Sequence, residues 1–176
     1  YIYAQHTDDI RRYRFGIRQG NQMGCGWIAT HNALRVLEAP MKPEDIIREY
    51  EAYGIFLQGI FGINPLAIAH FFTEKGYEVK ISFGNFEETA MDYEVNIMYY
   101  KKPPTDHYVA IVYDDENGVF WGYNTFGESD NSNVKNADNL GSSITVLTKT
   151  VNEGETSEKT DSYTGKILIS ISPKNK

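Results

Sequence analysis

The spacing of apolar residues changes once along this chain, near Gly76, and this change narrows the folds that the chain can form. Before Gly76, apolar residues recur every three or four positions, as they do on the buried face of a helix. After Gly76, apolar and polar residues alternate, as they do on strands with one buried face. Helices followed by strands predict an α+β fold, in which an antiparallel sheet packs against a helical layer.

Three helices are predicted in the first half of the chain. The first begins at Cys25 and ends before Pro40, and it is apolar on most sides, which is typical of a buried central helix. The second covers residues 43–53 and has one apolar face. The third begins after Asn64, a favourable capping residue, and ends at Gly76. We expect the helix that carries the cysteine to be central and to pack against the sheet.

The second half of the chain is predicted to form strands. They cover residues 77–83, 95–100, 107–113, 119–126, 143–150 and 166–171. The polar segment 152–161 is expected to be a mobile hairpin tip, and residues 1–18 are expected to form a wrapping arm. The apolar, glycine-rich segment 54–63 is either a loop packed on the core or one wall of a substrate groove. At 176 residues, the chain 1–176 is predicted to be a single domain with its own core.

Composition excludes several classes of function. The formal net charge is −7, which argues against binding nucleic acid by neutralising phosphates. One cysteine excludes a disulfide within the chain and a cysteine-rich metal site. No phosphate-binding loop or paired metal-ligand spacing occurs, so we expect neither a nucleotide nor a metal cofactor.

Two features of the sequence bear on the location of the protein. No run approaches 18 apolar residues, so no membrane span is predicted. The chain begins with Tyr1, which indicates either removal of a signal peptide or trimming. A secreted or cell-envelope location is favoured over a cytoplasmic one, and the sequence predicts no oligomeric state.

Cys25 stands between two glycines at the start of the first predicted helix, and Gln19 precedes it by six positions. The N-terminus of a helix has unpaired N–H groups and a partial positive charge, which favour a thiolate over a thiol. The sequence therefore predicts a reactive cysteine with a lowered pKa.

His107 is the predicted base for this cysteine. Of the other three histidines, His6 lies in the arm and His70 lies inside the third helix. His31 follows Cys25 by six residues on one helix, which turns it about 240° away. His107 opens a strand, where a side chain at the sheet margin can reach the end of a helix.

Asn124 is the predicted partner of His107. If residues 114–117 form the loop of a hairpin, His107 and Asn124 lie directly opposite each other, with Cβ atoms about 4.5–5.5 Å apart. Any loop with an even number of residues keeps both on one face. A buried amide needs a hydrogen-bond partner, and an imidazole N–H is suitable. Asp114 and Asp115 are alternative partners, although they lie at the turn, far from His107.

These residues take the roles of a thiol hydrolase. Cys25 is the nucleophile, and His107 accepts its proton and later protonates the leaving group. Asn124 orients the imidazole. Gln19 and the Cys25 backbone N–H donate to the developing oxyanion. The predicted substrate contacts are Gly24, Gly26 and Trp27. The alternative is structural: a small buried cysteine and a histidine that only packs.

These motifs resemble those of papain-like cysteine peptidases, and more closely those of compact bacterial peptidases similar to the double-glycine leader peptidases of bacteriocin exporters. The resemblance rests on Gln19 and Gly-Cys-Gly-Trp-Ile-Ala-Thr-His-Asn-Ala-Leu from Gly24, on His107-Tyr-Val-Ala-Ile-Val, and on Gly-Tyr-Asn ending at Asn124. It extends over about residues 15 to 127. It implies an active-site cleft between helix and sheet, and hydrolysis of a peptide or protein substrate through a thioester, without a metal.

The chain departs from the leader peptidases at one site position. Those enzymes usually carry Asp-Pro where this chain has Asn124 followed by Thr, so the third member here is more similar to papain's amide. Two alternatives remain open. The same site could hydrolyse a non-peptide amide or transfer an acyl group, or the fold could serve as a non-catalytic binding module.

Overall fold

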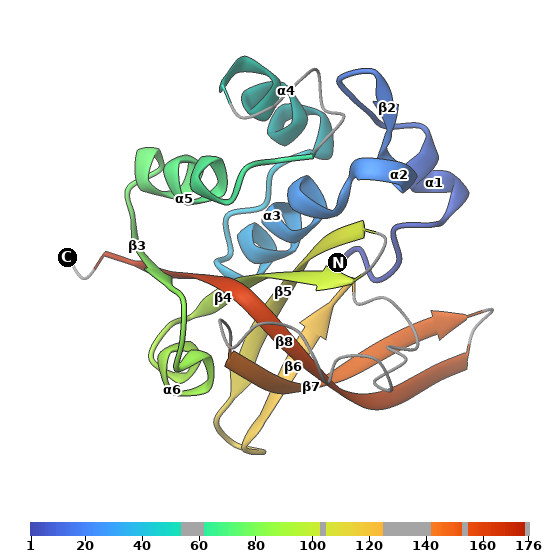
Figure 1. Ribbon diagram of the computed structural model, residues 1–176. Helices are drawn as coiled ribbons and strands as arrows, with labels where there is room; N and C mark the ends of the chain where they lie inside the picture. The colour runs from blue at the N-terminus through green and yellow to red at the C-terminus, as the bar shows by residue number, and fades with distance from the viewer. Residues whose placement is uncertain (54–61, 103–104, 125–141, 153–154, 175–176) are drawn as a thin grey trace.

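The computed structural model describes residues 1–53, 62–102, 105–124, 142–152 and 155–174, and it has an α+β architecture. A layer of helices covers one side of a twisted sheet (Figure 1). The first part of the chain contains α1 (Asp8–Arg11), β1 (Arg14–Phe15), β2 (Arg18–Gln19), α2 (Gly20–Met23), α3 (Cys25–Val36), α4 (Pro43–Tyr53) and α5 (Pro65–Glu74). The second contains β3 (Tyr77–Ser82), α6 (Phe86–Met91), β4 (Val95–Lys102), β5 (Thr105–Asp114), β6 (Val119–Tyr123), β7 (Ser142–Asn152) and β8 (Glu155–Pro173). The predicted fold class is therefore confirmed, with the cysteine on the central helix.

The helices begin and end where local chemistry places their boundaries. The Asn64 side chain accepts a hydrogen bond from the Leu66 N–H at 2.9 Å, so it caps α5 as predicted. Gly76 follows α5 with a φ of +86°, a conformation that favours glycine after a helix. Helix α3 is buried from Gly26 to Leu34, and it packs between α4 and the sheet.

The described strands form a two-stranded hairpin and a six-stranded sheet in the order β3-β8-β4-β5-β6-β7. All neighbours are antiparallel except β6 and β7, which are parallel. Strand β8 also pairs with β7, so strands β4, β5, β6, β7 and β8 close into a ring. The sequence predicted an antiparallel sheet but neither the parallel pair nor this closure.

Two hydrophobic cores result from this closure. The larger core lies between the helices and the sheet, and it includes Trp27, Ile97 and Tyr108. The smaller core lies on the opposite face of the sheet, inside the ring, where α6 covers it with Phe86. Neighbouring residues of β5 therefore contribute to different cores, because side chains alternate along a strand.

The segment 152–161 differs from its predicted form. The structure pairs β7 with β8 from Ser142 opposite Gly165 to Asn152 opposite Glu155, so residues 155–161 belong to a strand and not to a mobile tip. The sequence did not predict this strand, because its residues are mostly polar. They lack the alternation of apolar and polar residues that is typical of a strand with one buried face. The predicted substrate-groove wall at 54–63 lies mostly outside the described residues, apart from Gly62 and Ile63.

No helix in the described part of the chain has both the length and the apolar character needed to cross a membrane.

Candidate active site

Cys25 is the first residue of α3, and Gly24 immediately before it joins α2 to α3. Both flanking glycines are required by close packing. A Cβ atom on Gly24 would lie 2.2 Å from the Gly20 carbonyl oxygen. A Cβ atom on Gly26 would lie 2.9 Å from Cδ1 of Ile63. The two glycines thus let α2 and α3 join at Gly24 and let Ile63 cover the start of α3.

Trp27 has a structural role in this conformation. Its side chain is 0% exposed, and its ring packs 5.4 Å from the ring of Tyr13. Gly24 and Gly26 are also buried. A fully buried indole offers no surface to a substrate, so the structure does not bring the predicted substrate contacts Gly24, Gly26 and Trp27 to an open groove.

The sulfur of Cys25 lies against the beginning of β5. Although part of the residue is exposed, protein surrounds the thiol, and this burial raises its pKa to about 11. Hydrogen bonds from the backbone of Tyr108, Gly26 and Cys25 itself act in the opposite direction and lower the pKa. Burial is the larger effect, so the pKa of the Cys25 thiol is raised overall. The expectation of a lowered pKa from the helix terminus alone was wrong.

Three polar side chains share the face of the sheet that Cys25 contacts. The Tyr99 hydroxyl donates to the Asp106 carboxylate, and the rings of Tyr99 and Tyr108 lie 5.0 Å apart. Burial, followed by the Asp106 carboxylate, raises the pKa of Tyr99. The Tyr108 hydroxyl donates to the Ile63 carbonyl at 2.6 Å, which ties Ile63 over the helix start. Sequence reasoning missed these residues, although Asp106 and Tyr108 alternate with His107 along one strand.

His107 is 1% exposed and lies on the opposite face of β5. It pairs with Tyr100 across the β4–β5 ladder, and the two rings meet edge-on at 5.5 Å. Its Nε2 atom lies 2.6 Å from the backbone oxygen of Asn124. A carbonyl oxygen only accepts hydrogen bonds, so Nε2 carries the proton. In the neutral ring, the basic lone pair is therefore on Nδ1.

Asn124 follows the end of β6 in the left-handed region, with a φ of +62°. The hairpin register differs by two residues from the predicted one, because Asp114 pairs with Val119 and Ala110 pairs with Tyr123. Residue 124 still lies near His107, since a shift of two keeps the face. The contact, however, uses the Asn124 backbone and not its side chain. The side-chain Nδ2 is buried and has no hydrogen-bond partner among the described residues.

The three predicted residues thus gather at one end of β5. Cys25 contacts the Tyr108 backbone, and the neighbouring His107 holds Asn124. In this conformation, Cys25 and His107 approach the strand from opposite faces. The last β5–β6 pair in the described ladder is Ala110 with Tyr123, so residues 107–109 lie beyond this ladder and pair with β4.

Gln19 lies upstream of this group. It ends β2, pairs with Arg14 and forms the N-cap of α2, and its residue is half-buried. Helix α2 then leads directly to Cys25. The structure places the Gln19 backbone in a short hairpin, while its role as an oxyanion donor stays a prediction.

The other described histidines lie elsewhere. Nδ1 of His31 lies 3.2 Å from the Met41 carbonyl, and burial lowers the pKa of His31. His70 is exposed on α5. Within the described ranges, no group of three or more His, Cys, Asp or Glu side chains could hold a metal ion.

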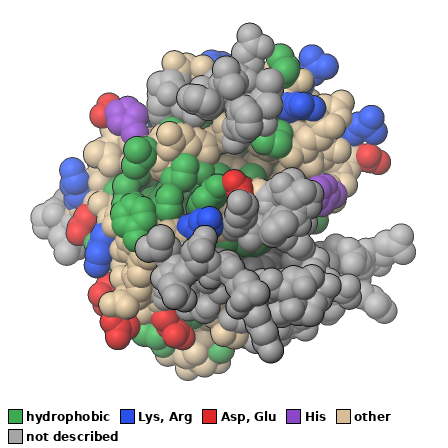
Figure 2. Space-filling view, viewed as in Figure 1, with side chains coloured by type: hydrophobic (Ala, Val, Ile, Leu, Met, Phe, Trp, Pro, Cys, Tyr) green, Lys and Arg blue, Asp and Glu red, His purple; other side chains and the backbone are tan. Residues whose placement is uncertain are grey.

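Apolar side chains gather where the helical layer meets the sheet. Figure 2 shows a patch of them between the helical layer and the sheet. Half-buried residues of the larger core contribute to this part of the molecule: Tyr77, Val79, Ile81, Tyr99 and Ile167. Tyr77, Val79 and Ile81 belong to the edge strand β3, whereas Tyr99 on β4 lies beside β5, the strand that Cys25 contacts, and next to the exposed Asp106.

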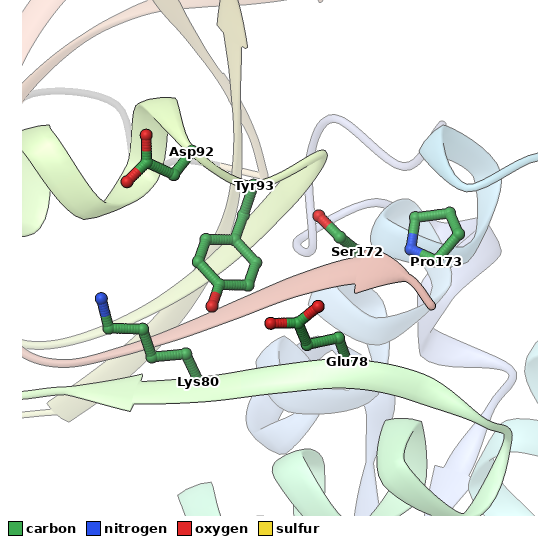
Figure 3. Close-up of a pocket in the computed structure, with 6 residues that line it drawn as sticks. All are labelled: Glu78, Lys80, Asp92, Tyr93, Ser172 and Pro173. Atoms are coloured by element: carbon green, nitrogen blue, oxygen red, sulfur yellow. The ribbon is translucent and has the colours of Figure 1, made fainter. Parts of the chain in front are cut away.

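A polar cavity of about 330 Å³ lies elsewhere on the sheet (Figure 3). It is lined by Glu78, Lys80, Asp92, Tyr93, Ser172 and Pro173. These residues come from β3, β8 and the turn before β4, so the cavity lies at the opposite end of β4 from Cys25. It shares no residue with the candidate active site.

Comparisons with known proteins bear mainly on the architecture. No protein-family description matches the chain. No curated protein matches it either. Among solved structures, it is similar to the peptidase domain of Streptococcus ComA, a bi-functional ABC transporter involved in a quorum-sensing pathway. The TM-score is 0.49 and the identity is 11%, with 99% of each chain covered. A likeness of this degree does not identify functional residues, so the site rests on the contacts described above.

Proposed function

We propose that this chain is a cysteine peptidase that hydrolyses peptide bonds through a thioester on Cys25. The observation that carries the proposal is the arrangement at the start of β5. There, the only cysteine of the sequence begins a buried helix and contacts the backbone of Tyr108, and the preceding residue on β5 is a histidine whose ring proton is fixed on Nε2 by the Asn124 carbonyl. A thiol, a base and a group that orients the base are the parts that nucleophilic acyl transfer requires.

The first step is proposed to begin from the thiol. Because burial raises the pKa of Cys25, we infer that the nucleophile forms during the reaction and not before it. For this step, Nδ1 of His107 must reach the face of β5 that Cys25 contacts, where it accepts the proton as the sulfur attacks the substrate carbonyl carbon. The Asn124 carbonyl, which accepts from Nε2–H, stabilises the imidazolium that results.

The remaining steps regenerate the site. The imidazolium donates its proton to the leaving amine as the carbon–nitrogen bond breaks, which leaves an acyl thioester on Cys25. His107 then removes a proton from water, which attacks the thioester, and the protonated thiol and a carboxylic acid are released. Gln19 and the Cys25 N–H are the proposed donors to the oxyanion of both tetrahedral intermediates.

A peptide is the proposed substrate because half-buried apolar side chains lie along the side of the sheet that packs on the helices, and because a net charge of −7 disfavours nucleic acid. Half-buried tyrosine, valine and isoleucine side chains along the sheet could receive apolar side chains of an extended peptide.

The test is cleavage of a peptide library, followed by mass spectrometry of products and of the acylated protein. The wild-type chain should cleave at least one peptide, and Cys25→Ala should cleave none. His107→Ala should lower kcat by about 10²–10⁴-fold. His70→Ala is the matched control, because His70 is exposed on α5, away from the site. Turnover of small amides without peptide cleavage would favour the non-peptide amidase alternative.

One observation favours a second candidate, a non-catalytic peptide-binding module. The Cys25 thiol is surrounded by protein, which raises its pKa, and His107 lies on the other face of β5. Such a module would bind peptides from the library equally well before and after Cys25→Ala, and no variant would show an acyl thioester.

A further inference from the structure

The first three residues of the chain lie beside the end of β6, where Figure 1 marks the N-terminus. They are held there by Asn32, a fully buried residue of α3. Oδ1 of Asn32 accepts from the Ile2 N–H at 2.8 Å, and Nδ2 donates to the Ile2 carbonyl at 2.9 Å. One side chain thus satisfies both backbone groups of Ile2, so the arm is fixed whatever side chain residue 2 carries.

The tyrosines on either side of Ile2 pack on Tyr123. The rings of Tyr1 and Tyr123 are stacked at 4.4 Å with an interplanar angle of 17°. The ring of Tyr3 lies 5.9 Å from that of Tyr123. The guanidinium of Arg35, also on α3, lies 5.5 Å from the centre of the Tyr1 ring. Asn32 and Arg35 therefore connect α3 to the last residue of β6 through the arm.

Tyr123 directly precedes Asn124, whose carbonyl holds Nε2 of His107. The β5–β6 ladder ends at Tyr123, and Asn124 turns into the left-handed region. The direction of its carbonyl therefore depends on how firmly Tyr123 is held. On the helical side of the sheet, residues 1–3 supply that restraint.

We propose that Asn32 and Tyr123 are positioning residues: through residues 1–3, they hold the Asn124 carbonyl against His107 and thereby fix the ring proton on Nε2. The catalytic meaning of this restraint rests on the proposed function, whereas the restraint itself can be measured on the imidazole. Neither residue touches the reacting atoms. Their effect reaches the reaction only through the orientation and the tautomer of His107.

The test uses the full chain with Asn32→Ala, Tyr123→Leu and Tyr1→Ala. Tyr1 is 44% exposed, so its replacement leaves the core intact even if the other two variants fail to fold. Tyr123→Phe keeps the stacked ring and serves as the conservative variant. Asn96→Ala is the matched control, because Asn96 is also fully buried, but its Nδ2 donates to Ala90 at 3.0 Å, away from the arm.

The main readout is the ¹⁵N chemical shift of the His107 ring nitrogens over a pH series, which reports the tautomer. The wild-type, Tyr123→Phe and Asn96→Ala chains should show the proton on Nε2. Asn32→Ala, Tyr123→Leu and Tyr1→Ala should show a mixture of tautomers. For a cleaved peptide, these three should lower kcat by about tenfold or more, with a much smaller change in KM.

An unchanged tautomer in Asn32→Ala and Tyr1→Ala would overturn the proposal, and so would an equal change in Asn96→Ala. Failure of the proposed function gives a different pattern. In that case, no variant changes peptide turnover and Cys25→Ala behaves as wild type, while the ring-nitrogen shifts still report whether the arm positions His107.

Discussion

Replacing Asn124 by glycine separates the two ways in which this residue could orient His107. The structure assigns the contact to the backbone carbonyl, 2.6 Å from Nε2, and leaves the side-chain Nδ2 without a described partner. Asn124→Gly removes the amide but keeps the carbonyl. Glycine also adopts the observed φ of +62° without steric cost. We therefore expect Asn124→Gly to keep kcat/KM within about threefold of wild type, less than the effect of one neutral hydrogen bond.

Asn124→Ala is the variant to compare with Asn124→Gly, because it also removes the side-chain amide but adds a steric cost. An alanine in the left-handed region costs about 1–2 kcal/mol, whereas asparagine and glycine are tolerated there. Asn124→Ala should therefore unfold at lower urea concentration than Asn124→Gly. Some of that strain should be relieved by rotation of the 124 carbonyl away from His107, so its kcat should fall further than that of Asn124→Gly.

The assay is urea unfolding of the three chains together with kcat/KM on one cleaved peptide. A fall in kcat for Asn124→Gly as large as that for His107→Ala would refute the reasoning. It would mean that the side-chain amide orients the imidazole, as the sequence first suggested, and that the backbone contact does not persist during turnover.

Three further predictions concern Cys25 and its cover. Burial raises the pKa of Cys25 from 9.0 to about 11, so the folded chain keeps a proton that the unfolded chain releases between these values. The difference in free energy of unfolding between the wild type and Cys25→Ser should therefore be constant below pH 9. Towards pH 11, the wild-type value should fall by at most about 2–3 kcal/mol relative to that of Cys25→Ser. The same pH dependence of unfolding in both chains would contradict this. Tyr108→Phe removes the donor to the Ile63 carbonyl and should lower the free energy of unfolding by about 1–3 kcal/mol in urea titrations. Gly26→Ala places a methyl group 2.9 Å from Ile63 and should cost about 1–3 kcal/mol, and Ile63→Ala in the same chain should recover part of it; no recovery would show that another contact causes the loss.

Helices and strands whose sequence signals lie within a few residues could be predicted from the sequence. The cap at Asn64, the proline at the start of α4 and the left-handed Gly76 each act within one turn of chain, so helices α4 and α5 have the predicted boundaries. The strands β3 to β6 were also found, because each has a buried face. Helix α6 and the first half of β8 were not predicted. A short polar helix and a polar strand lack the regular spacing of apolar residues from which the other elements were predicted.

The hairpin register shows how a local signal can mislead. The predicted loop was 114–117, but the observed turn is 115–118, with the Gly118 N–H bonded to the Asp114 carbonyl at 2.8 Å. Gly118 has a φ of +66°, and that conformation decides which residues close the turn. The difference of two residues kept Asn124 near His107 and replaced its side-chain contact by a backbone contact.

The sequence by itself determined the α+β class, the central helix that starts at Cys25, and the candidate residues Cys25, His107 and Asn124. These follow from periodicity, from caps and from the chemistry of single side chains, all of which are encoded over a few residues. Only the tertiary structure decided that β8 closes the sheet onto β7, that Asn124 contacts His107 through its carbonyl, and that burial raises the pKa of the Cys25 thiol. Each of these depends on contacts between distant segments, because strand closure, carbonyl direction and desolvation arise only once the chain is packed.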